Sequence, residues 1–232
     1  MKHLLLSIIA LLIWLPAQAQ TVSRSFGWLP DKAGVRDQNV ASLPKFTRAI
    51  VKAKTDLRAI MPPVYDQGMI GSCTGNGVAA LLDFAHVKSV SKATFFTPSR
   101  LFLYYGGRVA INTVNEDSGA QIRDVITVAL KQGAPTEKTW PYRESKYRTK
   151  PTATAYAEAM KYQALNAYKC STLDDVRRAL SLGLPVTFGV PVYPAIQELS
   201  WYDYTVPMPA PRERSIGGHC MVIVGHDDAR RV

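Results

Sequence analysis

The sequence predicts an α+β protein made of two lobes, a helical lobe followed by one rich in strands. Apolar residues from Val78 to Ala85 recur at steps of three and four, which is the period of a buried helix face. Beyond residue 160 the pattern changes, and the Val-rich runs at 185–192 and 219–224 are typical of buried strands. Early helices and late strands favour an α+β arrangement. A chain of 232 residues is long enough to bury a core.

The first residues are typical of an export signal. Lys2 and His3 precede an apolar run at 4–15, which is shorter than the ~20 residues that a membrane-spanning helix needs. Small residues at Ala17 and Ala19 then suit a signal peptidase. We therefore expect a signal peptide at 1–19 and an exported protein, periplasmic or extracellular, with no membrane contact after cleavage. An uncleaved membrane anchor is the alternative.

Residues 20–54 are mixed in character, and we expect an N-terminal arm or short pro-segment that lies on the domain. A short basic helix is predicted at 48–54. Glycine pairs and capping residues then delimit the helices of the first lobe. These helices are predicted at 73–88, at 99–105 before Gly106 and Gly107, from about 120 to Gly133, and at 152–162.

The second lobe begins with a predicted strand at 162–168. Thr172 is a helix cap, and Gly183 should end the helix that it starts. Strands are then expected at 185–192 and 219–224, joined by a long proline-bearing loop.

The formal net charge is +10, but Lys and Arg are scattered along the chain. No aromatic residues are interleaved with a basic run, so we expect a solvated basic surface and no nucleic-acid partner. The three cysteines are too few for a disulfide scaffold, and the odd count leaves at least one free thiol. At least one cysteine must therefore have a role other than forming a disulfide within the chain.

Cys73 is a candidate nucleophile. It stands at the predicted start of a helix, where the partial positive charge of the N-terminus lowers a thiol pKa. Gly71 and Gly75 allow a substrate backbone to approach, and the side-chain amide of Gln67 could fold back as an oxyanion donor. A buried structural cysteine is the alternative.

His219 is a candidate base. It opens a predicted buried strand, and Gly217 and Gly218 before it leave room for a substrate. An imidazole can take a thiol proton and later return it to a leaving amine. A metal site made of Cys73, His219 and His226 lacks the usual ligand spacing, so no metal is expected.

Three ordered motifs resemble those of the papain family of cysteine peptidases. Residues 66–73, Asp-Gln-Gly-Met-Ile-Gly-Ser-Cys, are similar to the family signature Gln-Gly-x-x-Gly-Ser-Cys. Residues 56–58, Asp-Leu-Arg, resemble the Asp-Trp-Arg element at the start of the mature domain. Residues 218–228 resemble the family's Gly-His-Ala-Val-x-x-Val-Gly-Tyr-Asp. Together they span the chain from about residue 55 to its end.

The resemblance implies both a fold and a set of roles. The fold would have a helical left lobe at about 55–160 and a β-barrel-like right lobe at about 161–232. Cys73 would be the nucleophile, His219 the acid–base and Gln67 the oxyanion donor. The substrate backbone would be bound at three positions, and no cofactor would be needed for a protein or peptide substrate. These three positions are Ser118, Gly119 and Gly218.

The sequence also departs from the family. Ile70 stands where many relatives have a disulfide cysteine, and the loop near Ser118 lacks the partner cysteine. An asparagine that orients the family's histidine is not found among the 13 residues (232 − 219) that follow His219. We therefore expect an exported bacterial member that is incomplete at its C-terminal end, with a right lobe lacking its last strands.

Three functions follow as alternatives. The first is a cysteine peptidase with a Cys–His pair. The second is a catalytically impaired pseudoenzyme or peptide-binding module, because the asparagine and the final strands are absent. The third is transfer of the acyl group to an amine instead of water. The sequence leaves the peptide specificity and the oligomeric state open.

Overall fold

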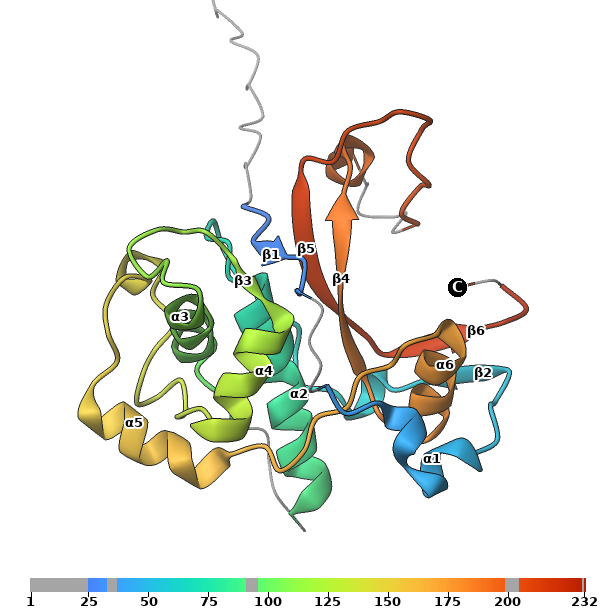
Figure 1. Cartoon of the computed structure of the whole chain (residues 1–232), viewed down its shortest axis with the longest axis horizontal. Helices are drawn as coiled ribbons and strands as arrows, with labels where there is room; N and C mark the ends of the chain where they lie inside the picture. Colours follow the sequence, from blue (N-terminus) through green and yellow to red (C-terminus); the bar gives the residue numbers. More distant parts are fainter. Residues whose placement is uncertain (1–24, 33–36, 91–95, 199–204, 231) are drawn as a thin grey trace, which may run out of the picture.

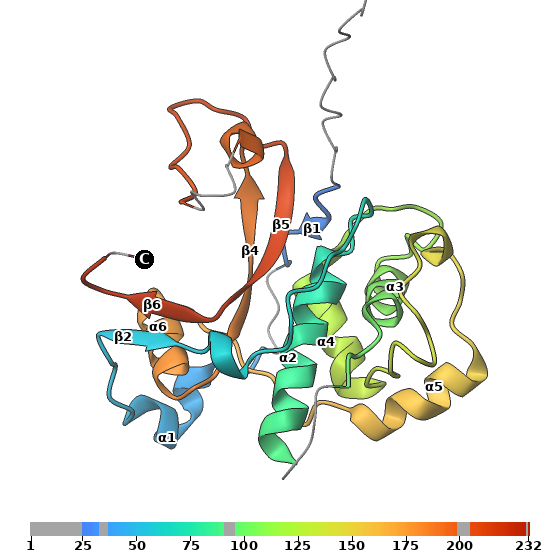
Figure 2. The same ribbon diagram turned by 180° about the vertical axis from the view of Figure 1, so that it is seen from behind.

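The computed structural model describes residues 25–32, 37–90, 96–198, 205–230 and 232. Most helices gather on one side, and most strands lie on the other together with two further helices, with a short strand between the two sides (Figure 1). The view from behind shows the same division (Figure 2). The predicted signal peptide at 1–19 and the start of the arm lie outside the described residues. The observed α+β order agrees with the sequence pattern.

The helical lobe packs around α2, which covers Cys73–Ser89 as predicted. This helix contacts the two helices that follow it in the chain and also strand β5 (Gly217–Ile223) of the second lobe, so it lies where the lobes meet. The core of the lobe is apolar and includes Val78, Leu101 and Val125. The remaining helices are α3 (Arg100–Ala110), α4 (Ile122–Lys131) and α5 (Ala153–Ala159).

Helix α3 continues through Gly106 and Gly107, so the predicted end at this glycine pair is wrong. The pair serves close packing instead. A Cβ on Gly106 would lie 2.7 Å from a methyl group of Val128, and one on Gly107 would lie 2.6 Å from a methyl group of Val125. The glycines therefore let α4 approach α3 at short range.

Two other glycines end helices as predicted. Gly133 follows α4 with a φ of 75°, and Gly183 follows α6 (Leu173–Ser181) with a φ of 73°. These left-handed conformations suit glycine at a helix C-terminus. Thr172 caps α6 by accepting a hydrogen bond from the Asp175 amide, and the Asp175 carboxylate accepts one from the Thr172 amide. This capping box confirms the predicted start.

The strand lobe contains two antiparallel pairs. β4 (Val186–Val192) pairs with β5 (Gly217–Ile223), and β2 (Lys54–Asp56) pairs with β6 (Gly225–Asp227). Helix α6 packs against both pairs. The strands described in this lobe pair two by two, and its barrel-like closure stays a prediction.

Two local predictions are wrong. Residues 48–54 form no helix, because α1 covers only Pro44–Thr47 and Lys54 already belongs to β2. Residues 162–168 form no strand, because their backbone runs over the end of α4. The Ala164 amide donates to the Ala129 carbonyl at 2.9 Å. Five short 3₁₀ helices are also described, at Val40–Ser42, Arg58–Ile60, Glu144–Lys146, Met160–Tyr162 and Pro194–Glu198.

Candidate active site

Cys73 is the first residue of α2, and its side chain is buried, with 1% of its surface exposed. Burial raises the pKa of the thiol, while backbone N–H groups of Cys220 and Gly27 oppose that shift. The lowered pKa expected from the helix N-terminus is therefore not found in this state. Desolvation outweighs the helix charge because other residues cover the sulfur.

His219 lies in β5, opposite Val190 of β4. Its ring packs edge-on against Phe26, with ring centroids 5.8 Å apart. The next residue, Cys220, is buried and points toward α2, where its sulfur would lie 3.0 Å from a Cβ on Gly77. The beginnings of α2 and β5 therefore face each other, with the Cys73 sulfur close to the backbone that carries His219.

Gln67 precedes this turn and directs its side-chain amide inward. The amide nitrogen donates to the carbonyl of Ser25 at 3.2 Å and to that of Ile70 at 3.0 Å. The backbone carbonyl of Gln67 accepts a hydrogen bond from the Tyr142 hydroxyl at 2.7 Å. The predicted oxyanion donor thus already holds a peptide carbonyl of this chain.

The predicted substrate loop lies on the helical side of the same region. Gly119 has a φ of 76° and leads into β3 (Ala120–Gln121). The Ser118 hydroxyl oxygen lies 2.6 Å from the Thr113 hydroxyl and 3.0 Å from the Gly119 carbonyl oxygen, so its one proton is bonded within the loop. The side chain of Ser118 is therefore bonded within its own loop. The backbone that follows, in β3, pairs with another strand.

The partner strand is part of the N-terminal arm, at residues 25–29, which we call the plug. β1 (Trp28–Leu29) pairs in parallel with β3, and the Ala120 amide donates to the Gly27 carbonyl at 2.8 Å. Gly27 also forms a parallel bridge with Gly218 on the strand side. β1 therefore lies between β3 and β5 (Figure 1), and the backbone N–H of Gly27 in the plug reaches the Cys73 sulfur.

The plug fits because the surrounding positions are glycines. A Cβ on Gly189 would lie 2.0 Å from the indole ring of Trp28, and one on Gly218 would lie 2.4 Å from its carbonyl oxygen. The sequence predicted an arm on the domain, but it did not place the arm over the thiol. The aromatic residues on either side of Gly27, Phe26 and Trp28, indicated only that this part of the arm would pack on the domain.

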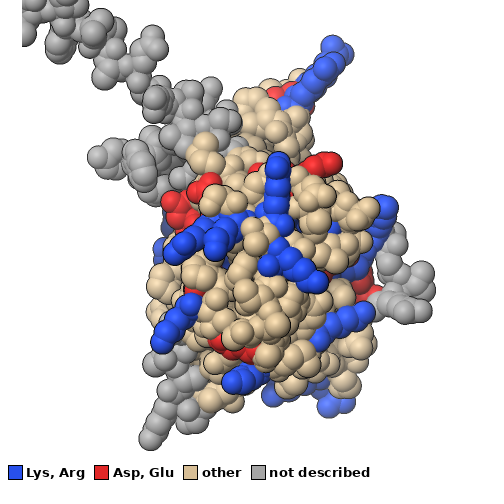
Figure 3. All heavy atoms as spheres, turned by 90° about the vertical axis from the view of Figure 1, so that its left-hand side faces the viewer, with Lys and Arg blue, Asp and Glu red and all other residues tan. Residues whose placement is uncertain are grey.

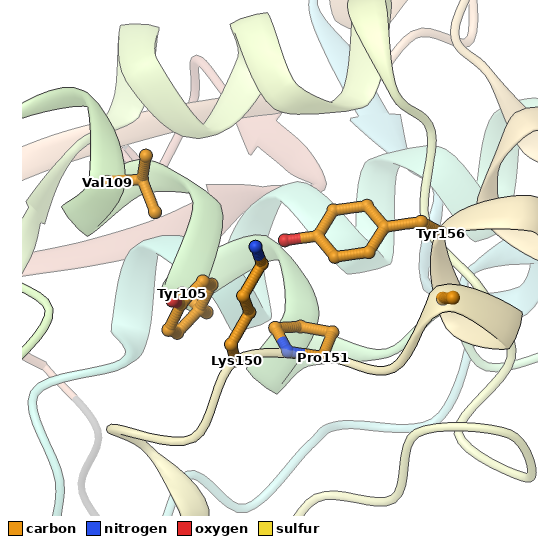
Figure 4. Close-up of a pocket in the computed structure, with 6 residues that line it drawn as sticks. Tyr105, Val109, Lys150, Pro151 and Tyr156 are labelled. Carbon is orange, nitrogen blue, oxygen red and sulfur yellow. The ribbon is translucent and has the colours of Figure 1, made fainter.

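Two hollows lie away from Cys73. One of about 700 Å³ opens between α3 and α5, where Lys150 and Tyr156 point toward each other (Figure 4). Another of about 600 Å³ lies beside α6 and β6. Cys73 lines neither of these two hollows.

Other features of the described residues bear on the classes of ligand. All three cysteines have free thiols, and no group of three or more His, Cys, Asp or Glu residues in the described ranges could hold a metal ion. Among those same residues, no helix has both the length and the apolar character needed to cross a bilayer. Figure 3 shows that Lys and Arg stand apart on the face of the helical lobe, with other residues between them.

Comparisons with known proteins bear on the family and the fold of the chain. No protein-family model matches the chain. The uncharacterized peptidase C1-like protein of Acanthamoeba polyphaga mimivirus is 37% identical over 236 residues, covering 90% of this chain and 75% of the viral protein. Xylellain, a cysteine protease from Xylella fastidiosa, is 32% identical with a TM-score of 0.78, covering 89% of this chain and 81% of the other.

A more distant structure shares the fold. Procathepsin B from Trypanosoma congolense has a TM-score of 0.67 at 15% identity, covering 88% of this chain and 72% of the other. Similarity at that identity extends to the arrangement of helices and strands.

Proposed function

This chain belongs to the papain-like cysteine peptidase family and is a cysteine peptidase, and on that premise we propose that Cys73 and His219 form its catalytic pair, with Gln67 as oxyanion donor. One observation carries the assignment. An extended segment of this chain lies over Cys73, between the substrate loop and the strand of His219, with its Ser25 carbonyl on the Gln67 amide. The groove is thus built to hold a peptide backbone.

The proposed reaction has two steps. The Cys73 thiolate attacks a peptide carbonyl carbon, and the carbonyl electrons move to an oxyanion that accepts from the Gln67 amide. The C–N bond breaks, and the His219 imidazolium gives its proton to the leaving amine. Water then attacks the thioester, His219 takes the water's proton, and the acid product leaves a thiol or thiolate on Cys73. No cofactor enters this scheme.

Backbone groups on both walls would hold the substrate. In the described form, the Ala120 amide donates to the Gly27 carbonyl of the plug, and Gly218 forms a β-bridge with Gly27. A protein or peptide substrate would use the same backbone groups. We assign Gly119 and Gly218 to this role. Ser118 would contribute through its backbone, since its hydroxyl is bonded within the loop.

The plug must leave before a substrate enters, so we propose that the described form is latent. Gly27 covers the thiol, and Phe26 packs on the proposed base. We also propose that residues 1–19 direct export to the periplasm or the outside. Mass spectrometry of the secreted chain would find Met1 retained if the signal peptide assignment were wrong.

A thiol-directed epoxide tests the catalytic pair. We expect it to label Cys73 in a chain carrying Gly27→Ala, which displaces the plug. Cys73→Ala should prevent labelling and hydrolysis of a fluorogenic peptide, and His219→Ala should slow both by at least 100-fold. Cys170→Ser, which alters a half-buried thiol in the other lobe, is the control and should change neither.

Three outcomes would count against the proposal. Labelling confined to Cys170 or Cys220 would remove Cys73 as the nucleophile. Labelling of Cys73 without hydrolysis would favour a peptide-binding or impaired protein. An amide product formed only when an amine is added would indicate acyl transfer in place of hydrolysis.

A further inference from the structure

Asp117 joins the substrate loop to the turn that carries Cys73. Both of its carboxylate oxygens accept from the Gly71 amide, at 3.0 and 2.8 Å. Gly71 lies two residues before Cys73, and Asp117 lies two residues before Gly119. A hydrogen bond to a carboxylate is shorter and stronger than one between neutral groups. One carboxylate therefore fixes the nucleophile turn relative to the opposite wall of the groove.

Tyr104 is hydrogen-bonded to Asp117 and adds a third residue to the Asp117–Gly71 link. Its side chain is fully buried in α3, and its hydroxyl donates to the Asp117 carboxylate. The same hydroxyl accepts from the Gly119 amide at 3.1 Å. Burial, followed by the hydrogen bond to Asp117, raises the pKa of Tyr104 far above its ordinary value, so the phenol keeps its proton and stays a donor. The link therefore runs from Gly119 through Tyr104 and Asp117 to Gly71.

Arg108 supports the link one helical turn later. Its guanidinium is fully buried and lies 4.1 Å from the centre of the Tyr104 ring. It donates to the carbonyls of Val114 at 3.1 Å and Glu116 at 2.8 Å, which belong to the loop that leads into Asp117. It therefore holds the loop in the shape that presents the carboxylate to Gly71.

We propose that Asp117 is a positioning residue that sets the spacing between a substrate bound along Gly119 and the sulfur of Cys73. The inference rests on the proposed peptidase function. The Asp117–Gly71 hydrogen bonds connect the turn before Cys73 to the substrate loop. Because attack requires the sulfur and the carbonyl carbon to be aligned, a small change in this spacing lowers the rate strongly.

The test compares Asp117→Asn with Glu116→Gln. Both remove one carboxylate charge from the loop, but the Glu116 side chain is exposed and lies outside the link. In chains that also carry Gly27→Ala, we expect Asp117→Asn to lower kcat per epoxide-labelled site by 10- to 100-fold, with KM changed less than threefold. Alkylation of Cys73 by iodoacetamide, which does not use the substrate loop, should change less than threefold.

Tyr104→Phe provides a second variant that removes a single oxygen. If the residues act as one link, the double variant Asp117→Asn with Tyr104→Phe should be less than threefold slower than Asp117→Asn alone. Independent effects would multiply instead. Equal kcat in the Asp117→Asn and Glu116→Gln chains would overturn the proposal, as would parallel losses in kcat and in alkylation.

Amide hydrogen exchange separates this inference from the proposed function. Asp117→Asn should raise exchange at Gly71 and Gly119 by at least tenfold, and Glu116→Gln should leave both unchanged. This readout needs no peptidase activity. A chain that never cleaves peptides but shows this exchange pattern would refute the catalytic assignment while supporting the link, and unchanged exchange would refute the link itself.

Discussion

The Cα of Gly27 lies against the carbonyl of Gly71, so closely that a Cβ on Gly27 would stand 1.8 Å from the carbonyl oxygen. This backbone contact has no flexible side chain that could yield. Gly27→Ala should therefore push the plug out of the groove and increase the rate of Cys73 alkylation by about tenfold or more. Pro30→Ala, at an exposed position just beyond the plug, is the matched control and should leave the rate unchanged.

The pH dependence of this alkylation supplies a second prediction. Burial under the plug raises the pKa of Cys73, and only the thiolate reacts. Opening the groove hydrates the sulfur and leaves it at a helix N-terminus, so the midpoint of the rate-against-pH curve should move to lower pH in Gly27→Ala. A midpoint that stayed in place or rose would show that burial does not control the thiol.

The ion pair of Asp56, the last residue of β2, with Arg58 predicts a small acid sensitivity, because both side chains are exposed to solvent. The Arg58 guanidinium holds the pKa of Asp56 at about 2, below its ordinary value of 3.8. Because the folded-state pKa is lowered, the contribution of this carboxylate to the free energy of unfolding is complete above about pH 4 and is lost as the pH falls toward 2. Asp56→Asn should flatten the fall in that free energy between pH 4 and 2, measured by urea unfolding. Arg58→Ala should flatten it similarly, and an unchanged slope in both variants would contradict the assignment.

The cap of α6 predicts a modest loss of stability. Thr172→Ala removes the hydroxyl that accepts from the Asp175 amide at 3.0 Å, and it should lower the free energy of unfolding by about 1 kcal/mol. Thr149→Ala, which alters an exposed threonine outside any helix, should have no comparable effect in the same denaturant titration. Equal losses in the two variants would show that the cap does not stabilise the fold.

Local sequence predicted those elements whose determinants are local. The apolar period after Cys73, the Thr172 cap and the glycines at 133 and 183 all act within one or two helical turns, and the structure has helices that begin or end there. Gly106 and Gly107 were misinterpreted because their role depends on Val125 and Val128, which lie on another helix. The sequence alone does not distinguish a glycine pair that ends a helix from one that lets another helix pack closely.

The surroundings of the candidate site were less predictable for the same reason. The motifs around Gln67, Cys73 and His219 predicted which side chains would carry the chemistry, and their roles stay predictions. Nothing adjacent in sequence indicated that Gly27 would cover the thiol, since 46 positions (73 − 27) separate the two residues. Asp117 was likewise given no role of its own, because its partner Gly71 becomes a neighbour only when the lobe has folded.

The plug belongs to an arm that is anchored again further along. Val40 and Phe46 are buried against Ala179 in the strand lobe, and the Val40 amide donates to the Lys169 carbonyl. Because the plug is tethered to this nearby anchor, it rebinds the groove at a high effective concentration. A plug that left the groove without being cut would therefore return quickly. A single peptide-bond cut between Leu29 and Val40 would make rebinding of the plug a bimolecular reaction. Dilution of the released plug would then make activation irreversible, while the arm from Val40 onward stayed on the strand lobe.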